Sequence, residues 1–336
     1  MTSTTALPLS VLDLVPVPAG STPSTALYNT LDLARRVEAL GYHRYWLAEH
    51  HNMPGIASSS PEIVISQVAR ETSRLRVGSG GVMLPNHAPL KVAESFQTLE
   101  ALFPGRIDLG IGRAPGTDPR TALALRRGGD LKADALPDML NELFALAGPG
   151  PVDGTPRYVS AYPAAPLPPV YLLGSSDFSA RVAAERGLGF AFAHHISPEP
   201  AVSSMYAYRE EFKPSAGGFS EPHAILTLSV ICADTADEAE RLASSAALVM
   251  LLLPRGKRIL IPSPEEALAY PYNEYDIEEM ARNRTRVIVG DPSTVWSTIQ
   301  GLAERSRADE VMITTIVHDH AARARSYELI ATEAEK

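Results

Sequence analysis

The chain has 336 residues, of which 45% are hydrophobic and 21% charged, and its formal net charge is −9. This composition is typical of a soluble globular protein and excludes a disordered or fibrous chain, and the acidic balance argues against general nucleic-acid binding, which needs a basic surface. The single cysteine, Cys232, excludes an internal disulfide framework and a cysteine-based zinc site.

Short runs rich in strand-forming residues alternate with amphipathic segments along the chain. Residues 9–17 predict a strand and residues 27–41 a helix, in which Leu33, Ala34 and Val37 share one face. Further strands are expected at 44–50, 75–84, 106–114, 169–176, 189–195, 225–234 and 310–317. Helices are expected near 61–73, at 89–105, near 135–146, at 177–186, near 199–211, from 237 into the 250s, within 289–306 and at the carboxyl terminus.

This plan of about eight strands, each followed by a helix, predicts an α/β fold, a single (β/α)8 TIM barrel that spans residues 1–336 as one domain. An open doubly wound sheet is the main alternative. Two stretches, residues 115–134 and residues 254–286, are too long for simple connections. Because the chemistry of a barrel lies at the carboxyl ends of its strands, we expect residues 254–286 to form an active-site lid. Surface decoration is the alternative.

The carboxyl ends of the expected strands, which converge on one mouth in a barrel, carry a consistent set of polar and small residues. The set comprises Glu49, His50 and His51 after the second strand, Gly78 to Gly81 in the third, Arg113 after the fourth, Ser175 and Ser176 after the fifth, and His194 and His195 after the sixth. Glycine offers nothing to pack inside a strand, so the glycines indicate that some group approaches the backbone closely. A flat ring on the strand or a β-bulge would explain them.

A serine-rich turn begins the helix expected at 177–186. Ser175, Ser176 or Asp177 can cap this helix, and the free N–H groups at its start favour an anion. Capping explains one serine. The three hydroxyls of Ser175, Ser176 and Ser179, joined by Arg113 from another strand, favour a phosphate site, with a surface ion pair of Arg113 as the alternative.

Two other motifs, a glycine-rich segment and the histidine pair, give little support for a dinucleotide site or a metal site. In GIGRAPG (110–116) the third glycine is one residue late for a dinucleotide-binding fingerprint. Neighbouring strand residues point to opposite faces, so His50 and His51 are poorly placed to chelate one metal, and no metal ligand is predicted. The first ten residues lack a signal-peptide layout, and the most apolar run, 246–254, is too short to span a bilayer. We expect a cytoplasmic protein that contacts no membrane.

Three stretches together resemble the bacterial luciferase-like flavin monooxygenases. They are RYWLAEHHNMPGIASSSPE (44–62), the block that contains LFPGRIDLGIGRAPG (102–116), and YLLGSSDFSARVAAERGLGFAFAHH (171–195). The similarity runs from Leu9 to about Leu329 and is weakest across 254–286. Gly112 stands where the light-emitting enzymes carry a reactive cysteine, so the resemblance does not extend to light emission from a long-chain aldehyde.

The resemblance implies a TIM barrel, often dimeric, that binds reduced FMN delivered by a separate reductase. The flavin ring is expected near Gly80 and Gly81, where the family often has a non-proline cis peptide. By similarity, the phosphate would meet Arg113, Ser175, Ser176 and Ser179, and His50 would be the acid/base or hydrogen-bond partner of the flavin, with His51 supporting it. Histidine suits this role because its ordinary pKa, ~6.5, lies near neutrality.

The sequence thus predicts a monooxygenase that uses reduced FMN and O₂ to oxygenate a small organic substrate. Tyrosines and prolines in residues 254–286 favour an apolar or aromatic substrate. We expect a homodimer formed through helices of the second and third units, with no nucleic-acid partner. Three alternatives stay open: hydride transfer with a deazaflavin, flavin binding without catalysis, and a metal-dependent barrel hydrolase.

Overall fold

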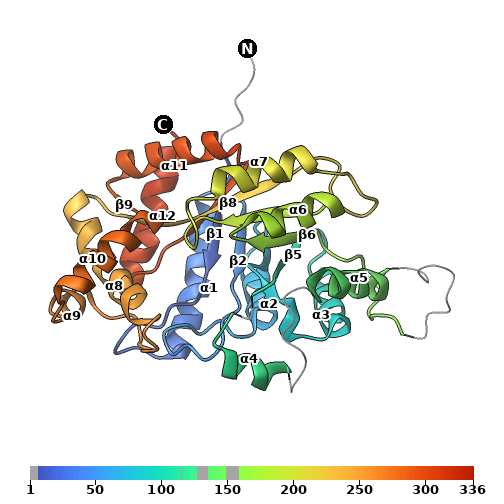
Figure 1. Ribbon diagram of the computed structural model, residues 1–336, viewed down its shortest axis with the longest axis horizontal. Helices are drawn as coiled ribbons and strands as arrows, with labels where there is room; N and C mark the ends of the chain where they lie inside the picture. The colour runs from blue at the N-terminus through green and yellow to red at the C-terminus, as the bar shows by residue number, and fades with distance from the viewer. Residues whose placement is uncertain (1–6, 115, 127–134, 149–158) are drawn as a thin grey trace, which may run out of the picture.

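The computed structural model describes residues 7–114, 116–126, 135–148 and 159–336. Its strands lie parallel in the order β10-β1-β2-β3-β5-β6-β7-β8-β9, and the additional pairing of β10 with β8 closes the sheet (Figure 1). The predicted closed barrel is therefore confirmed, and the open doubly wound alternative is wrong. Helices surround the barrel, with α7 and α11 along the upper edge of Figure 1 and α4 at the lower edge.

The bounds of the elements follow the predicted alternation closely. The strands are β1 (Leu9–Asp13), β2 (Arg44–Leu47), β3 (Arg76–Ser79), β4 (Val82–Met83), β5 (Ile107–Gly112), β6 (Val170–Gly174), β7 (Gly189–Ala193), β8 (Ala224–Cys232), β9 (Val287–Gly290) and β10 (Glu310–Thr314). The helices are α1 (Pro23–Ala39), α2 (Pro61–Glu71), α3 (Pro89–Leu102), α4 (Pro119–Arg126), α5 (Leu136–Ala147), α6 (Asp177–Arg186), α7 (Ala201–Glu211), α8 (Ala236–Leu252), α9 (Pro264–Leu268), α10 (Glu274–Asn283), α11 (Pro292–Ser306) and α12 (His320–Ala334), with short 3₁₀ turns η1 (Leu84–Asn86) and η3 (Arg284–Arg286).

Local chemistry explains where the helices begin and end. Helix α1 starts four residues before the expected position because the Thr22 hydroxyl accepts a hydrogen bond from the Thr25 N–H and Pro23 fits the first turn. Helix α6 ends where predicted because Gly187 adopts φ 66°, a left-handed conformation that glycine accommodates at no cost. In the ranges that the structure describes, none of the helices has the length and apolar character needed to cross a membrane.

One strand prediction needs correction, and one strand, β9, was not predicted. The strand expected over 75–84 is divided into β3 and β4, because the Gly80–Gly81 peptide between them is cis. Both halves still pair with β5, so together they occupy one strand position of the barrel. Strand β9 lies outside the barrel, since it pairs with the carboxyl half of β8 while β10 pairs with the amino half.

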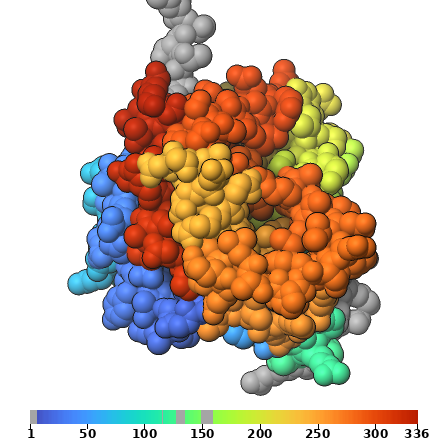
Figure 2. Space-filling model, turned by 90° about the vertical axis from the view of Figure 1, so that its left-hand side faces the viewer, coloured from blue at the N-terminus to red at the C-terminus, as the bar shows by residue number. Residues whose placement is uncertain are grey.

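The predicted lid over 254–286 is correct only for its first part. Residues 254–261 run across the mouth: Pro18 pairs with Ile261, and the Ile261 N–H donates to the Val17 carbonyl at 2.9 Å. Helices α9 and α10 instead pack against the outside of α8, as the orange segment in Figure 2 shows. The second part is therefore the surface decoration that was the alternative. In the other long stretch, α4 forms, and residues 115 and 127–134 lie outside the described residues.

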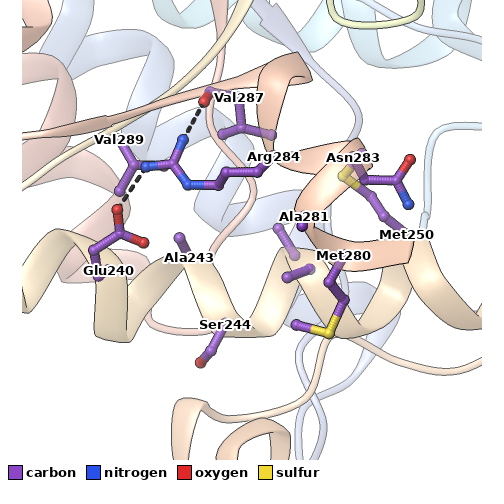
Figure 3. A pocket seen from close by; sticks show the side chains of 12 residues that line it. Glu240, Ala243, Ser244, Met250, Met280, Ala281, Asn283, Arg284, Val287 and Val289 are labelled. Carbon is purple, nitrogen blue, oxygen red and sulfur yellow. Dashed lines mark hydrogen bonds and ion pairs between the residues drawn. The ribbon is translucent and has the colours of Figure 1, made fainter. Parts of the chain in front are cut away.

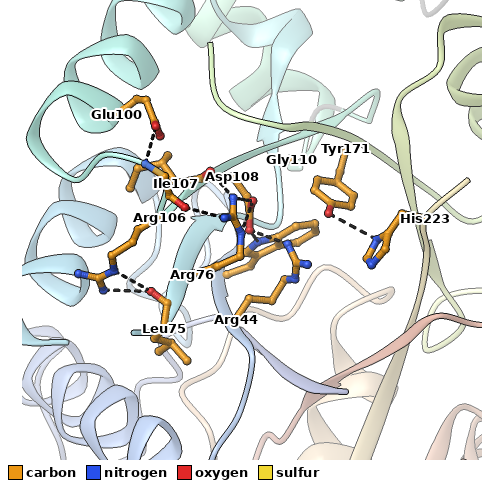
Figure 4. Close-up of polar contacts among 12 residues, drawn as sticks. Arg44, Leu75, Arg76, Glu100, Arg106, Ile107, Asp108, Gly110, Tyr171 and His223 are labelled. Carbon is orange, nitrogen blue, oxygen red and sulfur yellow. Dashed lines mark hydrogen bonds and ion pairs between the residues drawn. The ribbon is translucent and has the colours of Figure 1, made fainter. Parts of the chain in front are cut away.

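A buried charge cluster fills the amino-terminal end of the barrel. Arg44, at the start of β2, contacts Asp108 of β5 and Glu310 of β10, each at 2.7 Å. Arg76 places a second guanidinium on Asp108, and the Trp46 indole N–H donates to the same carboxylate at 3.1 Å (Figure 4). This cluster closes the bottom of the barrel and leaves the carboxyl-terminal mouth as the face where a site can form.

Candidate active site

The mouth brings together residues that lie far apart in the sequence. The His51 N–H donates to the Gly116 carbonyl beyond β5, and the Met83 N–H of β4 donates to the Glu49 carboxylate at 2.8 Å. The ends of β2, β4 and β5 are therefore joined by hydrogen bonds. Of the residues expected at the mouth, Glu49 and His51 take part directly in these contacts.

Glu49 organises this part of the mouth. Its carboxylate is fully buried, and its Oε1 atom lies 2.7 Å from His51 Nε2 and 2.8 Å from His87 Nε2. Burial alone would raise the pKa of Glu49, but the hydrogen bonds and charge of the two histidines lower it. Glu49 therefore remains ionised and holds both rings. His87, in the loop after β4, is a site residue that the sequence reasoning missed.

His50 lies beside Glu49 and His51, and one of its ring nitrogens lacks a hydrogen-bond partner among the described residues. Its Nδ1 atom is buried, and no described residue accepts or donates a hydrogen bond to it. Burial lowers the pKa of His50 to about 4, which the charge of Glu49 partly opposes. The ring is therefore neutral near pH 7. A buried polar atom without a partner is unusual in a folded protein and points to a ligand atom that completes it.

The second histidine pair reaches the same region. Burial lowers the pKa of His195 to about 4, and the charge of His50 contributes to this shift, so the two rings lie within electrostatic reach. The His195 Nδ1 atom lies 3.3 Å from the Thr227 carbonyl. Burial likewise lowers the pKa of His194.

The glycines are required by close approach, though of the protein itself. A Cβ atom at Gly81 would lie 2.6 Å from the Gly110 carbonyl oxygen, and one at Gly78 would lie 2.8 Å from the Trp46 indole nitrogen. A Cβ at Gly80 would collide with Leu12. Neighbouring strands and barrel side chains therefore explain why these positions are glycine. The cis peptide expected at Gly80–Gly81 is present.

The serine turn and Arg113 lie together at the ends of β5 and β6. The Arg113 guanidinium stacks on the Phe178 ring of α6 at 4.5 Å, and no carboxylate in the described part of the chain pairs with it. Within the described residues, the alternative of a surface ion pair finds no support. Ser176 occupies the capping position of α6, but its side chain makes no capping hydrogen bond.

The hydroxyls of the turn also have no hydrogen-bond partner among the described residues. Ser175 and Ser176 are half-buried and Ser179 is 3% exposed, and none of the three donates to or accepts from a described residue. Ser179 packs against Gly174 at the end of β6, where a Cβ would lie 2.6 Å from its hydroxyl oxygen. An uncapped helix start, three free hydroxyls and an unpaired guanidinium together can bind an anion such as a phosphate.

A cavity of about 320 Å³ opens beside His51. It is enclosed by the loops after β2 and β5 and by the first part of the 254–261 segment; the lining residues include Asn52, Thr117, Asp118, Pro254 and Arg258. A separate cavity of about 290 Å³ lies outside the barrel between α8, α10 and β9, lined by Ala243, Met250 and Met280 (Figure 3). No predicted site residue lines that second cavity. Within the described ranges, no group of three or more His, Cys, Asp or Glu side chains could hold a metal ion.

The Glu49 and His87 pair predicts a pH-dependent stability. The hydrogen bond and charge of Glu49 raise the pKa of His87 against the effect of burial. The stabilisation is complete below the ordinary histidine pKa of 6.5 and is lost as pH rises through the raised value. We expect His87→Ala to lower the melting temperature most at about pH 5 to 6 and less above about pH 8. A melting-temperature difference that stays constant over this range would contradict the pairing.

The fold defines the class of the protein as a (β/α)8 barrel. Its mouth combines a neutral buried histidine, two adjacent glycines and a serine-rich turn beside an arginine. The family model described as luciferase-like monooxygenase matches residues 7–310, and the chain belongs to this family. The resemblance inferred from the sequence is confirmed.

Individual relatives agree with this membership. The chain is 43% identical over 327 residues to a luciferase-like monooxygenase of Escherichia coli (strain K12), with 95% of each chain covered. It is similar to the crystal structure of apo-MsnO8, with a TM-score of 0.90, 38% identity and 98% of each chain covered. The chain also shares its fold with a type II Baeyer-Villiger monooxygenase, at a TM-score of 0.70 and 18% identity, with 98% of each chain covered. That protein is the oxygenating constituent of 3,6-diketocamphane monooxygenase from the CAM plasmid of Pseudomonas putida, and its structure was solved in complex with FMN.

Proposed function

We propose that this protein is a monooxygenase that uses reduced FMN, supplied by a separate reductase, and O₂ to oxygenate a small organic substrate. The observation that carries the proposal is the Arg113 guanidinium, unpaired within the described part of the chain, beside the serine turn of α6, which has no side-chain cap. Such an arrangement suits a phosphate group, because backbone N–H groups, hydroxyls and a guanidinium all donate hydrogen bonds. FMN is also the ligand named for the Baeyer-Villiger monooxygenase of the same fold.

The residues of the mouth divide between binding and orientation. Arg113, Ser175, Ser176 and Ser179 would hold the phosphate, and the Gly80–Gly81 segment would lie beside the flavin ring. Bound in its reduced form, FMN supplies the electrons that activate O₂ for transfer of one oxygen atom. The chain binds and orients the cofactor and excludes water from the reacting atoms.

The role of His50 follows from its protonation state. With a pKa of about 4, the ring is neutral at physiological pH and can donate from one nitrogen while accepting at the other. This favours a hydrogen-bond partner over a cationic acid. His51 acts as a supporting residue, since the Glu49 carboxylate fixes its ring at 2.7 Å. A neutral ring adds no charge to a site that must remain dry.

Exposed apolar side chains on α2 and α3 support a homodimer. Ile63 on α2 is 64% exposed and Leu102 on α3 is 62% exposed. These helices contact each other, so the two apolar side chains can contribute to one isologous interface between two copies of the chain. A homodimer through this face is the assembly we propose, and its mass in solution tests it.

The experiment is an anaerobic titration of the purified protein with photoreduced FMN, followed by mixing with air. Binding of oxidised FMN should quench its fluorescence, and bound reduced FMN should reoxidise at a rate distinct from that of free FMN. Parallel titration with a deazaflavin separates the hydride-transfer alternative. Failure to bind oxidised or reduced FMN would overturn the proposal, and binding of the deazaflavin alone would replace it.

A further inference from the structure

Arg258, in the segment 254–261 at the mouth, indicates which class of substrate the site binds. Arg258 lies between Leu252, the end of α8, and Ile261, which is hydrogen-bonded to the loop after β1. The segment is thus anchored on both sides of Arg258. The side chain of Arg258 reaches Asp118, beyond β5, at 2.8 Å. This contact joins the 254–261 segment to the loop after β5.

Two adjoining cavities meet at Arg258. The cavity of about 320 Å³ beside His51 has mixed walls, in which Asn52 and Thr117 are polar and Met53 and Pro254 are apolar. A smaller cavity at the mouth, of about 60 Å³, has apolar walls formed mainly by Leu14, Ile56, Val249, Ile259 and Ile316. Both are lined by Met53, Leu253 and Arg258. Arg258 therefore lies where a cavity with mixed walls adjoins an apolar one.

Asp118 does not depend on Arg258 for its hydrogen bonds. Its carboxylate accepts from the Thr121 hydroxyl at 2.6 Å, from the Asn52 amide at 3.2 Å and from the Arg120 and Thr121 N–H groups. Among the described residues, Arg258 pairs only with Asp118, so most of its five donors have no protein acceptor there. A ligand anion could take the guanidinium while Asp118 stayed satisfied.

We propose that the substrate is a small organic anion, a carboxylate or a sulfonate, with an apolar arm. Its charged group binds Arg258, and its arm enters the cavity lined by Leu14 and Ile316. Lys257, which also lines the apolar cavity, adds positive charge near the bound anion. This inference names the substrate class of the proposed oxygenase site and therefore rests on that function. The phosphate of FMN is assigned to a different cation, Arg113.

The test is calorimetric titration of the flavin-free protein with hexanoate, hexanesulfonate and hexanamide. The three probes share one alkyl chain, and only the first two carry a charge. We expect both anions to bind about tenfold more tightly than the amide, because a charge-assisted hydrogen bond is about twice as strong as a neutral one. Arg258→Met should remove this preference, whereas Asp118→Asn should strengthen anion binding by removing a competing charge.

The matched control is Arg241→Met. Arg241 is 42% exposed against 38% for Arg258, pairs with Glu265 at 2.6 Å, and lines neither cavity. It should leave the binding of all three probes unchanged. Equal binding of amide and anions, or unchanged anion binding in Arg258→Met, would overturn the inference. So would a loss of FMN affinity in Arg258→Met, since that assigns the guanidinium to the cofactor. Anion binding by a protein that binds no flavin would refute the oxygenase function and leave the anion site standing.

Discussion

Replacing His50 by alanine is expected to lower turnover by about 10²- to 10³-fold, the loss typical when a positioned hydrogen-bonding group is removed from a reacting centre. His50 follows β2 at the mouth, its Nδ1 atom is buried with no partner in the ranges that the structure describes, and burial lowers its pKa to about 4. The neutral ring is thus available to a ligand. Steady-state oxygen consumption with reduced FMN measures the effect.

Two further variants separate the role of His50 from a structural one. His50→Gln keeps a donor and an acceptor and should restore part of the rate, whereas His50→Ala should retain FMN binding and the melting temperature. Because the ring is neutral above about pH 5, the wild-type rate should show no titration of His50 between about pH 5.5 and 8. Unchanged turnover in His50→Ala would favour flavin binding without catalysis.

Asp108→Asn is expected to destabilise the protein by about 3–5 kcal/mol, the cost of breaking a buried ion pair. Asp108 is fully buried and contacts Arg44 at 2.7 Å and Arg76 at 2.5 Å. Burial would raise the pKa of Asp108, but the two guanidinium charges outweigh it and lower the pKa. Without the carboxylate, Arg44 keeps Glu310 and Arg76 loses its carboxylate partner. Chemical denaturation followed by circular dichroism measures the loss.

A surface pair provides the matched comparison for Asp108→Asn. Glu265→Gln makes the same carboxylate-to-amide change opposite Arg241, at 2.6 Å, but Glu265 is 73% exposed. Solvent screens such a pair, so the change should cost no more than about 1 kcal/mol. Equal losses in the two variants would show that the bottom cluster does not stabilise the barrel.

The barrel could be predicted from the sequence because its signals are local and repeated. Helix α6 was expected at 177–186 and is found there, since a polar turn precedes it and Gly187 ends it. The break between β3 and β4 could not be read in the same way. The glycines indicated a close approach, but the groups that approach, Gly110 and Trp46, come from other strands.

The candidate site was partly predictable for a related reason. The order of strands places Arg113 and the serine turn at neighbouring strand ends, and the structure brings them together through Phe178. The partnership of Glu49 with His87 joins residues 38 positions apart, and no short-range pattern predicts it. A histidine in the loop after the third expected strand was the available signal.

The long segment 254–286 shows a further limit of sequence reasoning. Its length predicted a lid as one unit, yet only residues 254–261 cross the mouth. The capping boxes at Ser263 and Asn273 start α9 and α10, which then pack on α8. These caps are local signals and could have divided the segment. The contact of Arg258 with Asp118 depends on tertiary structure and could not.

The most direct measurement compares the affinities of FMN and riboflavin, which differ by the phosphate alone, in the wild-type protein and in Arg113→Met. The control is Arg181→Met on the outer face of α6, whose side chain is 56% exposed. We expect wild type and control to bind FMN about 30-fold more tightly than riboflavin, and Arg113→Met to lose most of this preference. Equal affinity of the wild-type protein for the two flavins, or an unchanged preference in Arg113→Met, would contradict the assignment of the phosphate to Arg113 and the serine turn.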